Sequence, residues 1–121
     1  MLRRLTLALA FSLIAAPAVA GGAAVSGVEI EKTGERTYRV TATVRHDDEG
    51  WEHYSNAFTV ETIDGEVLGV RTLHHPHVDE QPFTRSLDGV EIPPDVNTVT
   101  VRARDSVHGF DGRGMTVIVP D

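Results

Sequence analysis

The clearest pattern in the chain is an alternation of apolar and polar residues between positions 37 and 46. Every second side chain from Tyr38 to Val44 is apolar, and the residues between them are arginine or threonine. Successive side chains of a β-strand point to opposite faces of its sheet, so this period of two predicts a half-buried strand. The inward-facing series ends on His46.

Six further segments have strand-forming patterns and are separated by turn residues. They are Val25–Ile30, Tyr54–Ile63, Val67–Leu73, Phe83–Leu87, Thr98–Arg104 and Met115–Val119. Asp64-Gly65 is a strong hairpin signal, so the segments on its two sides should be antiparallel neighbours. We expect Val90–Asp95 to be the connection that leaves the fifth strand. Seven short strands without a helical pattern predict an all-β, two-sheet antiparallel sandwich.

The inward-facing positions of these strands predict the core. It should contain Tyr38, Val40, Ala42, Val44, Phe58, Val60, Leu87, Val99, Val101, Val117 and Val119. The single tryptophan, Trp51, is also expected in the core; the alternative is that it forms an apolar wall beside His53 together with Tyr54.

The first 20 residues have the layout of a secretory signal peptide. Arg3 and Arg4 precede the apolar run Leu5–Ala16, and Pro17–Ala20 has the small residues of a cleavage site. The apolar run is shorter than the roughly 20 residues of a membrane-spanning helix. We therefore expect residues 1–20 to be removed and residues 21–121 to form one β-sandwich domain that is periplasmic or secreted and does not span a membrane.

Charge and cysteine content limit the classes of partner. After Ala20 the chain has 18 acidic and 9 basic residues, a formal charge of −9 with neutral histidine. That charge argues against nucleic acid as a partner and is compatible with cations or with a basic protein of the cell envelope. The chain has no cysteine, which excludes thiol catalysis and cysteine-based metal sites.

The segment from the fifth to the sixth strand resembles a known module. Phe83–Pro93 followed by Thr98–Ala103 is similar to the corresponding region of a fibronectin type III or related immunoglobulin-like domain, over about a fifth of the chain. The resemblance implies an immunoglobulin-like sandwich whose loops gather at its two ends.

All six histidines are expected at one end of such a sandwich. Successive strands run in opposite directions, so the loops that follow the second, fourth and sixth strands share an end. These loops contain His46, His53, His74, His75, His77 and His108. The segment His74–Pro82 is the richest, and its prolines favour a loop over a central strand.

Histidines from separate loops predict a metal site. Neutral imidazole is a good ligand for zinc and copper, and a rigid sheet can preorganise ligands from distant segments. The predicted ligands are His53, His75, His77 and His108, with His46 as a reserve ligand. Asp105 continues the inward series of the sixth strand, so we expect it to orient one of these ligands from behind; an ion pair or a loop-capping role is the alternative.

The segment Asp105–Gly109 is also similar to the Asp-x-His element near the end of small periplasmic copper carriers, which are β-sandwiches of this size. This resemblance implies a copper carrier or buffer. In those proteins a histidine at the mature N-terminus is a further ligand, whereas cleavage after Ala20 would leave Gly21 there.

Two other classes of function stay open. The acidic, histidine-bearing loops could instead recognise a protein or a glycan, as the end loops of immunoglobulin-like domains often do. We expect no enzyme, because no activated nucleophile and no spaced carboxylate pair is apparent in the sequence.

We predict that the exported protein begins at or near Gly21, because Ala18 and Ala20 satisfy the pattern of a cleavage site. N-terminal sequencing of the exported form checks this. A mature form that kept Met1 would contradict the assignment and place the protein in the cytoplasm.

Overall fold

The computed structural model describes residues 22–121, which form seven β-strands and no helix. The strands are β1 (Ala24–Lys32), β2 (Thr37–Arg45), β3 (Ser55–Thr62), β4 (Val67–Thr72), β5 (Phe83–Glu91), β6 (Thr98–Asp105) and β7 (Met115–Ile118). The expected signal peptide at residues 1–20 lies outside the described residues. Within those described, no helix is long and apolar enough to cross a membrane.

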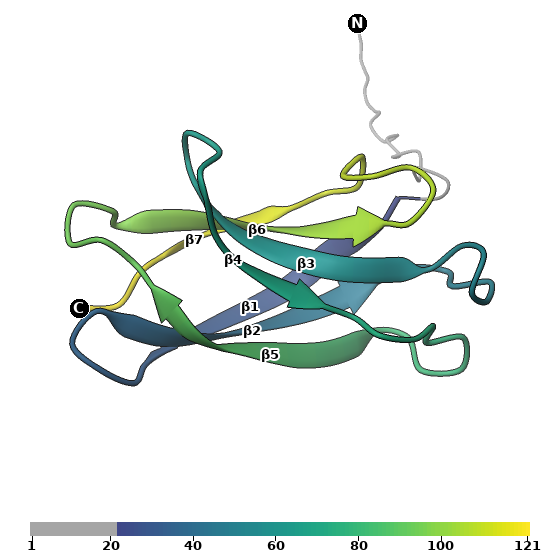
Figure 1. Cartoon of the computed structure of the whole chain (residues 1–121), viewed down its shortest axis with the longest axis horizontal. Helices are drawn as coiled ribbons and strands as arrows, with labels where there is room; N and C mark the ends of the chain where they lie inside the picture. The colour runs from purple at the N-terminus through teal and green to yellow at the C-terminus, as the bar shows by residue number, and fades with distance from the viewer. Residues whose placement is uncertain (1–21) are drawn as a thin grey trace, which may run out of the picture.

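The strands pair into two antiparallel sheets that enclose one core (Figure 1). One sheet has the order β1-β2-β5 and the other the order β4-β3-β6-β7. β2 and β6 are interior strands of their sheets, and every second residue of each is buried. The predicted all-β, seven-strand, two-sheet antiparallel sandwich is therefore confirmed.

The core agrees closely with the alternation in the sequence. Nine predicted core residues are buried, namely Tyr38, Val40, Ala42, Val44, Phe58, Val60, Val99, Val101 and Val119. Leu87 and Val117 are partly exposed and pack against this cluster. Phe83, Val90 and Ile92 also lie in the core.

β5 is longer than the sequence pattern predicts. We expected it to stop at Leu87, but it continues to Glu91. The register with β2 shifts there, so that Val40 pairs with Leu87 and Tyr38 pairs with Val90. Gly89 has a φ of 71°, a left-handed conformation that suits glycine. This irregularity turns Val90 inward and hides the continuation of the strand from a strict period-two pattern.

The hairpin predicted at Asp64-Gly65 joins β3 to β4. Gly65 adopts a φ of 93°, and its N–H donates to the carbonyl oxygen of Thr62. The two strands are antiparallel partners in the same sheet, as expected.

Three loops gather at the end of the sandwich where β2, β4 and β6 terminate, at the right of Figure 1. We call this end the histidine pole and define it by the loops 46–54, 73–82 and 106–114. All six histidines lie in these loops, as predicted.

Trp51 is not in the core, contrary to our expectation. Its side chain is 68% exposed, and its ring meets the edge of Tyr54 with centroids 5.7 Å apart. It lies in the tight turn closed by the N–H of His53, which donates to the carbonyl oxygen of Gly50. The turn projects from the pole, so its tip cannot reach the space between the sheets.

We predict that Phe58→Ala lowers the free energy of unfolding by about 3–5 kcal/mol, because it removes a fully buried ring and leaves a cavity. Val70→Thr, on a side chain that is 51% exposed, keeps the β-branched shape and should change it by less than about 0.5 kcal/mol. Urea denaturation followed by circular dichroism measures both. Equal effects of the two substitutions would contradict the assigned core.

Candidate metal centre

The centre of the histidine pole is the carboxylate of Asp105, the last residue of β6. The inward alternation of β6 carries it into the interior, where it has no exposed surface, as predicted. Its Oδ1 accepts hydrogen bonds from the backbone N–H groups of Val107 and His108. Its Oδ2 is left to face the side chains of the neighbouring loops.

Two imidazole rings meet at Asp105 Oδ2. His46 Nε2 lies 2.7 Å from this oxygen and His53 Nε2 lies 2.9 Å from it. The ring centroids are 4.9 Å apart and the rings are nearly perpendicular. His46 and His53 both belong to the loop 46–54, whereas Asp105 ends β6, so two segments that are distant in sequence supply the three groups.

The Nδ1 atom of each ring, on the side away from Asp105, faces a carboxylate of its own. His46 Nδ1 bonds to Asp48 Oδ1, and His53 Nδ1 lies 2.8 Å from Glu49 Oε1. The side chain of Asp48 is fully buried, whereas that of Glu49 is 70% exposed. A carboxylate behind an imidazole fixes the orientation of the ring, an arrangement that proteins use around metal ions.

Asp48 also connects this network to the loop 73–82. Its Oδ1 accepts the backbone N–H of Ser55, and its Oδ2 accepts the backbone N–H of His77 at 2.7 Å. Gln81 bridges the same two loops, since its Oε1 accepts the N–H of His46 and its Nε2 donates to the carbonyl oxygen of His77. The three loops of the pole are therefore joined through buried polar groups.

Both nitrogens of each ring lie at hydrogen-bond distance from a carboxylate oxygen, and a ring protonated on both nitrogens can donate to both carboxylates. Burial disfavours a charged His46 and is the largest single influence on it, but the hydrogen bonds and charges of Asp48 and Asp105 together raise its pKa above the usual value. Hydrogen bonds to Glu49 and then to Asp105 raise the pKa of His53.

The pKa of Asp105 is lowered to about 2. Burial opposes this shift and is its largest single influence. The backbone N–H groups of Val107 and His108 and the two imidazoles outweigh it by stabilising the ionised carboxylate.

His77 has a different environment from His46 and His53. It is buried, its ring stacks on Phe83 with centroids 4.0 Å apart, and its Nε2 lies 3.0 Å from Arg85 Nη2, which donates to it. Burial and then the charge of Arg85 lower its pKa. A neutral ring that accepts at Nε2 carries its proton on Nδ1, so no lone pair is available to a metal in this arrangement.

The structure brings together some of the predicted ligands and not others. Within residues 22–121, the one group of three side chains whose ligand atoms all lie within 4.8 Å is His46, His53 and Asp105. The exposed ring of His108 meets His53 at a centroid distance of 5.2 Å, and the exposed His75 lies 4.8 Å from His77. These three loop histidines share the pole but lie outside the converging group.

Two features of this centre differ from the sequence-based hypothesis. Asp105 lies between the two rings and could itself bind an ion, instead of orienting a ligand from behind. The groups behind the rings are Asp48 and Glu49, which the sequence places in an acidic turn. One signal could have identified Asp48. The alternation that buries every second residue of β2 continues past the strand through His46 to position 48.

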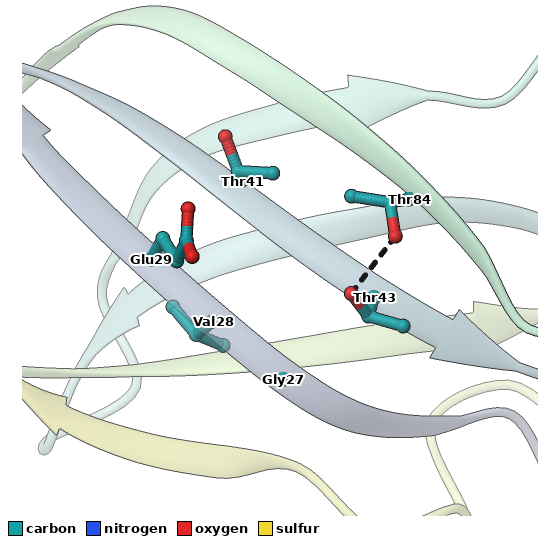
Figure 2. Close-up of a pocket in the computed structure, with 6 residues that line it drawn as sticks. All are labelled: Gly27, Val28, Glu29, Thr41, Thr43 and Thr84. Atoms are coloured by element: carbon teal, nitrogen blue, oxygen red, sulfur yellow. Dashed lines mark hydrogen bonds between the residues drawn. The ribbon is translucent and has the colours of Figure 1, made fainter.

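A hollow on the outer face of the β1-β2-β5 sheet differs from the histidine pole in its chemistry. That hollow has a volume of about 390 Å³ and is lined by Gly27, Val28, Glu29, Thr41, Thr43 and Thr84 (Figure 2). The hydroxyls of Thr43 and Thr84 bond to each other at 2.9 Å, and no histidine lines the hollow. Its single carboxylate and its hydroxyls do not match the ligand preference of zinc or copper.

We predict that replacing His46 by glutamine destabilises the metal-free protein more at pH 5.5 than at pH 9. A raised folded-state pKa contributes stability that is complete below the unfolded-state value near 6.5 and is lost as pH rises through the folded-state value. Removing one partner of a buried ion pair should cost about 3–5 kcal/mol at the lower pH. Urea denaturation at the two pH values measures the difference.

His53→Gln is the milder variant and should show the same direction, while His74→Gln replaces an exposed histidine outside the network and should change the free energy of unfolding by less than about 0.5 kcal/mol at either pH. The prediction fails if the His46→Gln effect is equal at pH 5.5 and pH 9.

Comparison with known proteins identifies one similar protein. Over 93 residues, 77% of this chain, the sequence is 39% identical to a protein of Halomicrobium mukohataei that carries the name "Putative lipoprotein". The chain spans 45% of the length of that relative. No family model matches the chain, and no solved structure matches it.

Proposed function

We propose that this protein is an exported β-sandwich protein that holds one divalent transition metal ion, zinc or copper, and serves as its carrier or buffer. The observation that supports this most strongly is the convergence of His46 Nε2 and His53 Nε2 on Asp105 Oδ2, with a second carboxylate behind each ring. Two imidazole nitrogens and one carboxylate oxygen are a common protein ligand set for a zinc ion that keeps a further position open.

Charge balance supports a divalent ion at this place. A proton on the Nε2 of His46 and of His53 would let each ring donate to the ionised carboxylate of Asp105 in the metal-free network. One divalent cation in place of these two protons leaves the net charge of the network unchanged. Asp48 and Glu49 would keep their hydrogen bonds to the Nδ1 atoms, so the exchange requires no new charge in the interior.

The donor atoms favour Zn(II) or Cu(II) over Cu(I). Cu(I) prefers soft thiolate and thioether ligands. The chain has no cysteine, and the converging atoms are nitrogen and oxygen. Imidazole and carboxylate suit both divalent ions, so titration has to decide between them.

Access to the centre supports a carrier or buffer over an enzyme. The side chains of His46 and Asp105 are 1% and 0% exposed, and that of His53 is 18% exposed. A small ion can pass His53 on its way in, but a larger substrate would find little open surface beside the ion. We therefore propose a non-catalytic role.

Export is supported by the signal-peptide pattern at residues 1–20 and by the name of the Halomicrobium mukohataei relative.

We predict that the metal-free protein binds one Zn(II) or Cu(II) per chain in calorimetric titration at pH 7.5. His53→Ala should weaken binding at least tenfold, because it removes a ligand that is partly exposed and leaves the core in place. Asp105→Asn should weaken it as well, since the amide removes the charge at the centre while it keeps the shape of the side chain.

His74→Ala is the matched control, because His74 is an exposed histidine of the same pole outside the converging group. The double variant His75→Ala/His108→Ala tests the loop histidines and should keep most of the affinity. If the protein binds no ion, or if His53→Ala binds as tightly as the unaltered protein, the network has a structural role. The alternative of a protein- or glycan-binding module would then be the better proposal.

A further inference from the structure

Each loop of the histidine pole exposes one apolar side chain. Trp51 is 68% exposed in the loop 46–54, Val78 is 56% exposed in the loop 73–82, and Val107 is 58% exposed in the loop 106–114. Single exposed apolar residues are ordinary on protein surfaces. Three of them on three separate loops around one centre suggest a contact surface.

The backbone holds these three side chains in place. Val107 N–H donates to Asp105 Oδ1 at 2.7 Å, and Gly109 and Asp105 exchange two backbone hydrogen bonds that close the turn. Val78 follows His77, whose N–H donates to Asp48. Trp51 lies in a turn closed by hydrogen bonds between Glu49 and His53 and between His53 and Gly50. Side chains presented on an ordered backbone lose little entropy when they are covered.

The surroundings of these side chains are acidic. The three loops contain seven acidic residues, of which six are exposed and Asp48 is buried, and one arginine, Arg113. Glu52 and Asp79 are exposed and directly follow Trp51 and Val78, and Asp47 is exposed in the same loop as Trp51. A surface of this kind complements a cationic surface that carries apolar side chains.

We propose that the histidine pole is a docking surface for a protein that presents such a cationic, apolar-bearing surface. The partner would cover His53, the part of the candidate metal centre that reaches solvent. A role of this partner in delivering or removing the ion rests on the proposed function. The docking surface itself depends only on the three apolar tips and the acidic residues around them.

Charge argues against two other occupants. A second copy of the chain would place one acidic pole against another, and an anionic membrane would be repelled in the same way. The chain carries a formal charge of −9 after Ala20. A cationic protein is the occupant for which both the apolar and the charged groups find partners.

Trp51 supplies the measurement, because it is the only tryptophan of the chain. The probe is an amphipathic helical peptide of leucine and lysine. Neither residue fluoresces, so the tryptophan emission comes from Trp51 alone. We expect saturable binding with a blue shift of Trp51 emission, and an affinity that falls as salt is raised. A peptide with serine in place of leucine and the same charge should bind at least tenfold more weakly.

Variants locate the contact. Val78→Ser and Val107→Ser should each weaken peptide binding about five- to tenfold, because each removes an apolar contact. Ile118→Ser is the matched control; it alters a side chain that is 77% exposed on β7, outside the pole, and should leave binding unchanged. Both the metal-free and the zinc-loaded protein are tested, so a failure of docking can be told from a failure of metal binding.

Three results would overturn the proposal. Equal binding of the leucine–lysine peptide by Val107→Ser, Val78→Ser and Ile118→Ser would mean that the pole is not the contact. A blue shift with vesicles of phosphatidylcholine and phosphatidylglycerol, but none with the peptide, would identify a lipid surface instead. A shift that grows with protein concentration alone would identify a second copy of the chain.

Discussion

The structure of the histidine pole depends on the buried carboxylate of Asp105. This carboxylate has no exposed surface and accepts hydrogen bonds from two imidazole rings and two backbone N–H groups. A buried charge without such partners would be severely destabilising. The end of β2, the turn before β3 and the turn after β6 are therefore held together, because each supplies a donor that the carboxylate needs.

The same geometry would link protonation and stability to the binding of a metal ion. In the metal-free protein, the carboxylates that surround His46 and His53 raise the pKa of both rings and so favour their protonated forms. An ion at this centre would replace those protons at nitrogen atoms that the second carboxylates already orient. An ion that binds only the folded chain stabilises it by mass action, so uptake of the ion would also tighten the three loops.

The sequence predicted where this centre lies better than it predicted which residues form it. The inward parity of β6 correctly placed Asp105 in the interior, and strand direction correctly placed every histidine at one pole. Asp48 was missed because an acidic turn is normally solvated, although it continues the parity of β2. The pairing of His77 with Phe83 and Arg85 depends on the path of the loop 73–82, for which the sequence holds no periodic signal.

The sequence by itself determined the fold class, the position of nearly every strand, most of the core and the end of the sandwich where the histidines gather. These properties follow from a local rule, since alternation along a strand decides which side chains face inward. Only the tertiary structure decided that His46 and His53 meet at one oxygen of Asp105 while His75, His77 and His108 do not. Such a meeting depends on loop paths and side-chain rotamers to within about 1 Å, and the pattern of residues along a chain carries no information at that scale.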